Sequence, residues 1–146
     1  MAEEIYCHAV NLFFEARGES PLGQRWVLDV VINRVESKSW DNTICGVVTA
    51  PAQFSWYTKH KEDMPKSPML WEDYIYNLYK DNETELAAWQ RCYLLALKHY
   101  LTSDSDLSEG SNHYMTTYVY NTGGQVPFYN TEVVEVIGNH IFFKSL

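Results

Sequence analysis

One glutamate near the start of the chain, Glu15, has the chemical setting of a general acid. It lies in the segment FFEARGES, residues 13–20, directly after two aromatic side chains. A carboxyl group that borders a cleft and is flanked by aromatic rings loses hydration, and this loss raises its pKa. Such a carboxyl stays protonated near neutral pH and can donate its proton to a leaving group. The alternative is a solvated surface carboxylate that pairs with Arg17 or with a more distant lysine or arginine.

The residue spacing around Glu15 predicts a mostly buried helix from about Glu3 to Arg17. Glu3 and Glu4 suit the positive N-terminal end of such a helix. With about 100° of rotation per residue, one broad apolar face is formed by Ile5, Tyr6, Ala9, Val10, Leu12, Phe13, Phe14 and Ala16. The remaining sector is formed by Cys7, His8, Asn11 and Glu15. A cleft along this strip is one explanation for polar residues on a mostly buried helix.

Local signals predict where this helix ends and where the next one begins. Gly18 follows Arg17 and is expected to end the first helix, because glycine accepts the left-handed conformation common at that point. Ser20 and Pro21 are the expected N-cap and first residue of a second helix, which extends to about Ser37. The apolar face of this helix is formed by Leu22, Trp26, Val27, Val30, Val31 and Val35.

The middle of the chain gives weaker signals. Residues 44–48 are a short apolar run that fits either a short helix or an extended segment. Residues 51–57 are expected to form a loop or a short extended segment, and residues 59–68, with two prolines, an exposed loop. Residues 71–80 fit a short helix rich in tyrosine and tryptophan.

A third long helix is predicted from Asn82 to about Leu101. Asn82 and Glu85 have the spacing of a capping box. Apolar residues then recur at helical spacing and are the predicted core of this helix: Leu86, Trp89, Tyr93, Leu97, Tyr100 and Leu101.

The C-terminal part predicts a small β-hairpin. Residues 113–120 are expected to be extended, and residues 121–125 to form a turn. Residues 133–137 and 141–143 are predicted strands that are joined at residues 138–140. The predicted fold is therefore mainly α with a small β-hairpin element, in a single domain that covers all 146 residues.

Composition and charge exclude some classes of function. The formal net charge is −8 and the pI is near 5.0, which argues against a nucleic-acid partner and gives no long-range attraction to an anionic surface. Aromatic residues make up 15% of the chain; most are packing residues, but this content also suits a carbohydrate cleft. The sequence shows no signal peptide and no run of transmembrane length, so a soluble chain made in the cytoplasm is expected, and a cell-wall substrate would need another route of access.

The cysteines predict neither a disulfide framework nor a metal site. Cys7, Cys45 and Cys92 lie far apart and include no C-x-x-C motif, which suits a reducing cytoplasm. Cys7 has no local signature of a nucleophile and is predicted to be a buried thiol. A zinc site made of Cys7, His8 and a distant histidine has no supporting ligand spacing. No metal and no cofactor are therefore predicted.

Several segments together resemble the SleB-type cell wall hydrolases, which occur in spore cortex-lytic enzymes and in phage lysins. The similar segments cover both ends of the chain in the order of the family: residues 14–19, 23–24, 31–35, 43–48, 53–55, 113–114 and 137–143. The E-A-R-G-E motif with its following N-R-V is fairly specific, whereas His-Tyr alone would be weak.

This resemblance implies a mainly helical, lysozyme-like catalytic fold and a peptidoglycan substrate. It implies cleavage of the β-1,4 bond between N-acetylmuramic acid (MurNAc) and N-acetylglucosamine (GlcNAc), often by a lytic transglycosylase. The catalytic glutamate of the family falls on Glu15. Residues 59–81 look longer than in the spore enzymes, and the export signal and peptidoglycan-binding repeat of those proteins are not seen. A bare catalytic domain of a phage endolysin is therefore expected, as a monomer that acts on the wall after release from the host cytoplasm.

Glycosidic cleavage needs an acid for the leaving oxygen, and a hydrolase usually adds a second carboxylate. Glu19 is the obvious candidate for this second carboxylate by its position. It is expected to be structural, however, and either to cap the next helix or to hold Arg17 or Arg34. Glu19 is also a candidate residue of the substrate cleft. A solitary Glu15 favours a lytic transglycosylase, in which the same glutamate then acts as base. A hydrolysing muramidase and a non-catalytic peptidoglycan-binding module stay open, whereas an amidase or peptidase would need a metal or a Cys/His pair that the spacing does not support.

The remaining cleft candidates come from two short segments. Each has a structural role as an equal alternative, because polar groups in sugar sites are few. The candidates are Gln53, Phe54, Ser55, His113 and Tyr114.

Overall fold

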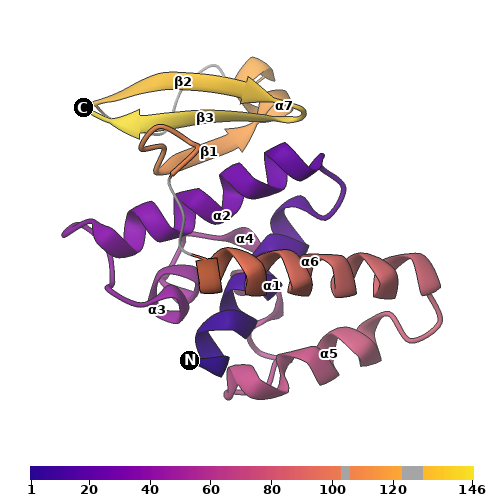
Figure 1. Cartoon of the computed structure of the whole chain (residues 1–146). Helices are drawn as coiled ribbons and strands as arrows, with labels where there is room; N and C mark the ends of the chain where they lie inside the picture. The colour runs from indigo at the N-terminus through magenta and orange to yellow at the C-terminus, as the bar shows by residue number, and fades with distance from the viewer. Residues whose placement is uncertain (103–105, 123–129) are drawn as a thin grey trace.

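The computed structural model describes residues 1–102, 106–122 and 130–146 of the chain (Figure 1). The helices are α1 (Ala2–Ala16), α2 (Pro21–Glu36), α3 (Ile44–Thr49), α4 (Ser55–His60), the 3-10 helix η1 (Pro68–Leu70), α5 (Trp71–Leu78), α6 (Glu83–Thr102) and α7 (Thr117–Thr122). The strands are β1 (His113–Thr116), β2 (Thr131–Ile137) and β3 (His140–Ser145). The mainly helical fold is thus confirmed.

Helix α1 is the central element of the helical part. It contacts α2, α3, α5 and α6, and most of its side chains are buried. Helix α2 lies between these helices and the sheet (Figure 1). Trp26 of α2 packs edge-on against Phe142 of β3, with ring centroids 5.1 Å apart. Helix α1, which includes Glu15, is therefore held by helices that pack on it from several sides.

The start of α2 follows the local sequence signals, but the end of α1 does so only in part. Ser20 caps α2, because its Oγ accepts a hydrogen bond from the Gly23 amide at 3.2 Å, and Pro21 is the first helical residue. Helix α1 ends at Ala16, as expected. The φ angle of Gly18 lies outside the left-handed region, so the expected conformation of this glycine was wrong. The chain turns instead through a right-handed Arg17.

Tertiary packing changes the predictions for the middle of the chain. The run after Thr43 is the short helix α3, one of the two structures that its sequence allowed. The prediction of a loop or extended segment at residues 51–57 was wrong from Ser55 onward, because α4 begins there. Its Trp56 is buried and stacks on Phe14 of α1, with ring centroids 5.2 Å apart. This packing favours a helix that local propensity does not predict.

Helix α6 begins as predicted but buries a different face. The amide of Glu85 donates to Asn82 Oδ1 at 3.1 Å, which confirms the cap. Only Trp89 of the predicted core positions is fully buried, whereas Leu101 is 60% exposed. The buried face is formed by Ala88, Trp89, Cys92 and Ala96. The smaller alanine side chains allow α1 and α6 to approach closely.

The C-terminal strands form an antiparallel sheet in the order β1-β3-β2. The predicted hairpin of β2 and β3 is confirmed, and β1 adds a third strand that pairs Tyr114 with Phe142. The extended structure expected for residues 113–120 ends at Thr116, because α7 follows. Of the turn expected at residues 121–125, the first two residues belong to α7 and the others lie outside the described residues.

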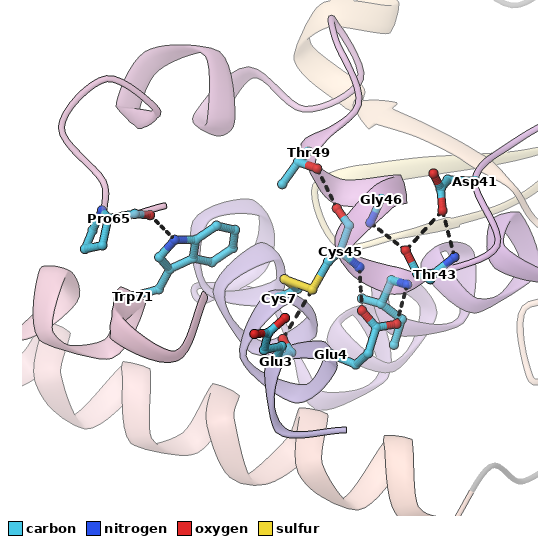
Figure 2. The surroundings of a disulfide bond; sticks show 11 residues. Glu3, Glu4, Cys7, Asp41, Thr43, Cys45, Gly46, Thr49, Pro65 and Trp71 are labelled. Atoms are coloured by element: carbon cyan, nitrogen blue, oxygen red, sulfur yellow. Dashed lines mark hydrogen bonds between the residues drawn. A yellow bond between two sulfur atoms is a disulfide. The ribbon is translucent and has the colours of Figure 1, made fainter. Parts of the chain in front are cut away.

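A disulfide bond between Cys7 and Cys45 joins α1 to α3 (Figure 2). The Glu4 carboxylate accepts hydrogen bonds from the first two amides of α3, those of Ile44 at 2.6 Å and Cys45 at 2.9 Å. The prediction of a free buried thiol at Cys7 was therefore wrong. Since disulfides persist in oxidising environments, the cysteines no longer support a reducing compartment. Cys92 is a buried free thiol.

Loss of this disulfide should destabilise the fold. Cys45→Ser is expected to lower the free energy of unfolding by about 2–4 kcal/mol, because a cross-link of this kind restricts the unfolded chain. Thermal unfolding with and without dithiothreitol measures the effect. The reductant should destabilise the wild type and leave the variant unchanged. Equal unfolding temperatures for the oxidised wild type and the variant would contradict the cross-link.

Within the described residues, no helix is both long and apolar enough to cross a membrane.

Candidate active site

The Glu15 side chain projects from the last turn of α1 and accepts a short hydrogen bond. The Tyr114 hydroxyl of β1 donates to Glu15 Oε1 at 2.6 Å. Burial raises the pKa of the Glu15 carboxyl above its usual value, while the hydrogen bond from Tyr114 and the positive charge of Arg34 oppose this rise. The expected desolvated acid is therefore present, together with two groups that stabilise its ionised form.

Tyr114 is held by aromatic neighbours on the sheet. Its ring lies edge-on to His140 and packs against Phe142, at centroid distances of 5.2 and 5.6 Å. Burial raises the pKa of the Tyr114 hydroxyl well above its usual value, and the nearby Glu15 carboxylate adds to this rise. Tyr114 thus keeps its proton and remains a hydrogen-bond donor to Glu15. Tyr114 therefore contacts the candidate acid directly, and its part in the reaction stays a prediction.

Arg34 of α2 is a buried cation beside this pair, and sequence reasoning did not assign it to the site. Its side chain is 5% exposed, and its Nε donates to the Asn112 carbonyl at 2.7 Å. The guanidinium lies over the rings of Trp40 and Phe54, 5.2 Å from each centroid. Its Nη1 has no hydrogen-bond partner within the described part of the chain. The sequence signal that could have assigned Arg34 to the site was its position within the N-R-V motif.

An open hollow of about 720 Å³ borders Glu15. It is surrounded by Glu15, Ala52, Gln53, Phe54, Ser55, Thr58, Lys59 and Val119. Gln53 and Ser55 are exposed, as groups that contact a ligand must be, whereas Phe54 is 4% exposed and mainly supports Arg34 and Tyr114. The structure therefore brings the predicted segment of residues 53–55 next to Glu15. Among the described residues around this hollow, Glu15 is the only carboxylic acid.

His113 does not border this hollow, although it is adjacent to Tyr114 in sequence. Successive side chains of a strand point to opposite faces of the sheet, and the His113 ring packs edge-on against Trp40 at 5.4 Å. Burial, helped by the positive charge of Arg34, lowers the pKa of His113 to about 4. His113 is thus neutral near pH 7 and is not among the side chains that surround the hollow.

Glu19 holds the turn between β2 and β3. Its Oε1 accepts from the Asn139 amide at 2.9 Å and from His140 Nδ1 at 3.2 Å, and its Oε2 accepts from Asn139 Nδ2 at 3.1 Å. Gly138 adopts φ +55°, and a Cβ at this position would lie 2.8 Å from Glu19 Oε1. The expected structural role fits these contacts, but the expected partners do not, since Arg17 pairs with Glu85 at 2.6 Å. Glu19 does not border the hollow either.

The other polar residues of the α1 strip do not line a cleft. Cys7 is in the disulfide, His8 Nε2 lies 3.0 Å from His99 Nδ1, and Asn11 Oδ1 accepts from Trp56 Nε1 at 2.8 Å. Each of these side chains is at most 1% exposed. The expected cleft along the strip was therefore wrong except at Glu15, because the strip is used for buried links between helices. No group of His, Cys, Asp and Glu in the described ranges is arranged to hold a metal ion.

Known proteins resemble this chain both in sequence and in fold. A 52-residue stretch, 36% of the chain, is 42% identical to the spore cortex-lytic enzyme of Bacillus cereus, but it spans only 20% of that enzyme. The crystal structure of the catalytic domain of the Bacillus cereus SleB protein matches with a TM-score of 0.62 and 24% identity, covering 99% of this chain and 91% of that domain. The catalytic domain of the germination-specific lytic transglycosylase SleB from Bacillus anthracis matches with a TM-score of 0.65 and 24% identity, covering 99% and 96%.

The two structural matches confirm the predicted lysozyme-like fold. The family model described as cell wall hydrolase matches residues 18–143, which begin three residues after Glu15. The assignment of Glu15 thus depends on its geometry as well as on the motif that it begins. Because the match extends over most of the 146 residues, this chain belongs to the cell wall hydrolase family.

Proposed function

We propose that this chain cleaves the MurNAc–GlcNAc β-1,4 bond of peptidoglycan glycan strands as a lytic transglycosylase. The observation that carries the proposal is the solitary Glu15. This acid is desolvated, accepts a hydrogen bond from Tyr114 and borders a hollow with no second carboxylate among its described residues. The name of the Bacillus anthracis structural neighbour supports the same reaction.

In the first step, protonated Glu15 gives its proton to the glycosidic oxygen as the bond from C1 of MurNAc to that oxygen breaks. Positive charge then develops at C1, and Glu15 becomes a carboxylate. The Tyr114 hydroxyl and the Arg34 charge stabilise this carboxylate, because both favour the ionised form. Burial favours the protonated form, so the site can supply the acid and accept the conjugate base in turn.

In the second step, the Glu15 carboxylate removes the proton from the C6 hydroxyl of the same MurNAc. The C6 oxygen then bonds to C1 and forms a 1,6-anhydro ring. Glu15 is protonated again, no water is consumed, and the enzyme is ready for another cycle. One carboxyl group is sufficient for this sequence.

A hydrolysing muramidase is the second candidate, and it differs in its need for a second carboxylate. Glu19 cannot readily serve, since its two oxygens are occupied by Asn139 and His140. A non-catalytic binding module would need the aromatic groups but not Glu15. We also propose that the protein is a phage-type endolysin, which reaches the cell wall after its release from the host cytoplasm. The disulfide fits such an oxidising destination.

Mass spectrometry of digested peptidoglycan separates these candidates. A lytic transglycosylase leaves 1,6-anhydro ends, and we expect this product. The same product should form in the presence of excess EDTA, because a carboxylic acid that acts on a sugar needs no metal ion. Reducing ends would instead indicate a muramidase, released stem peptides an amidase, and no products a binding module. Activity that disappears with EDTA and returns with zinc would contradict the metal-free mechanism.

Glu19→Ala should affect stability more than chemistry. We expect the free energy of unfolding to fall by about 1–3 kcal/mol, because the exposed Asn139 and the buried His140 both lose the charged acceptor of their hydrogen bonds. The type of product should stay unchanged. Thermal unfolding and product analysis of the same preparation measure both effects. A well-folded variant without activity would show that Glu19 takes part in the reaction and would favour the hydrolase.

A further inference from the structure

A second hollow, of about 500 Å³, lies next to the one that contains Glu15. It is surrounded by Phe14, Arg17, Trp56, Lys59, His60, Leu78 and Tyr79. Phe14 and Glu15 are consecutive residues of α1, and Lys59 of α4 borders both hollows. The two hollows therefore adjoin each other at Lys59, and together they are called the groove.

Aromatic rings line the second hollow. Phe14 stacks on Trp56 with an angle of 17° between the rings, and on His60 with ring centroids 4.7 Å apart. Ligand sites are typically concave and mostly apolar, and a few polar groups in them set the orientation and the specificity. Lys59 is the residue that borders both halves of the groove, and its side chain ends in a charged ammonium group.

Among the described residues that border the groove, Lys59 has the one positive charge without an ion-pair partner. Arg17 pairs with Glu85 at 2.6 Å, so its charge is already balanced. Burial and the nearby Lys59 lower the pKa of His60, which is therefore neutral near pH 7. Lys59 is exposed and takes part in none of the ion pairs of the described residues.

The groove thus differs in charge from the protein as a whole. The chain has a net charge of −8, yet the described residues around both hollows include a single carboxylic acid, Glu15. By contrast, a hollow on another part of the surface is bordered by Glu4, Asp29, Glu36 and Asp106. An anionic substrate would be repelled by most of this surface and attracted locally by Lys59.

We propose that Lys59 binds a carboxylate of the substrate beside the bond that is cleaved, and so makes the enzyme prefer anionic glycan strands. This inference depends on the proposed function, because it assigns a partner within the same groove. Muramic acid has such a carboxylate on its lactyl ether when the stem peptide is absent, and the stem peptide has others when it is present. Lys59 is thus a specificity residue, and Glu15 remains the acid.

The test uses two forms of the same glycan strands. One form has free carboxylates, and in the other these carboxylates have been converted to amides with carbodiimide and ammonium. The readout is the ratio of the two cleavage rates for each enzyme variant. For the wild type we expect about threefold faster cleavage of the free form at low salt, the size of one partly exposed ion pair, and a smaller ratio at high salt. Lys59→Gln should bring the ratio close to one, and Lys59→Glu should invert it. Lys61→Gln, a change at an exposed neighbour outside both hollows, should keep the wild-type ratio.

Strands with and without stem peptides identify the carboxylate. A preference that persists after the stems are removed assigns the lactyl group, and one that requires the stems assigns a peptide carboxylate. Equal rates of the wild type on free and amidated strands would overturn the inference, as would a full preference in Lys59→Gln. A wild type that cleaves no strand at all would instead overturn the proposed function.

Discussion

Glu15→Gln is expected to lower the rate of wall cleavage by at least about a hundredfold, the usual contribution of a general acid. Glutamine keeps the shape of the side chain and can still accept the hydrogen bond from Tyr114. It cannot give a proton to the leaving oxygen, and it cannot take one from the C6 hydroxyl. Both steps of the proposed reaction therefore fail together.

The clearing of a suspension of purified cell walls measures this effect, and circular dichroism shows whether the fold is retained. Glu36→Gln is a suitable control, because Glu36 is an exposed residue of α2 that borders a different hollow. The control should clear the suspension at the wild-type rate. A folded Glu15→Gln variant with near wild-type activity would remove Glu15 from the mechanism.

Tyr114→Phe is expected to change the pH dependence of cleavage as well as its rate. The Tyr114 hydroxyl lowers the pKa of Glu15, which burial raises. Without the hydroxyl the pKa of Glu15 rises further, so the acid stays protonated to higher pH. The limb of the pH–rate profile on which activity falls with rising pH should therefore move to higher pH. The maximal rate should fall about tenfold, because one hydrogen bond to the developing carboxylate is lost.

The profile of kcat/KM against pH is the measurement, since a purely structural defect would lower the rate without moving the limb. Tyr76→Phe is the matched control, because Tyr76 lies on α5 and its hydroxyl accepts a long hydrogen bond from Gln90 Nε2, at 3.4 Å. It should reproduce the wild-type profile. A limb that moves to lower pH in Tyr114→Phe would contradict the role assigned to this hydroxyl.

The features that could be predicted from the sequence depend on residues that are close together in the chain. The Ser20 cap and the Asn82 cap are formed by groups three residues apart, and both are present. Glu15 was proposed as the acid in a similar way, from the aromatic residues next to it and from the motif that it begins. The hairpin of β2 and β3 has a short turn, so its two strands were also predicted.

The features that were missed depend on groups far apart in the chain. Cys7 and Cys45 are separated by 38 positions, and no spacing rule pairs them. Glu19 meets Asn139 at a separation of 120 positions, so its partners were assigned wrongly. The role of Arg34 depends on rings and carbonyl groups that only the folded chain brings together.

The central claim is that one carboxyl group performs both steps without water. Digestion of peptidoglycan by the wild-type protein in water enriched in oxygen-18, followed by mass spectrometry of the new glycan ends, tests it most directly. The proposed mechanism predicts 1,6-anhydro ends without the label, because the C6 hydroxyl of the substrate itself attacks C1. Reducing ends that contain oxygen-18 would show that water is the nucleophile and would contradict the claim.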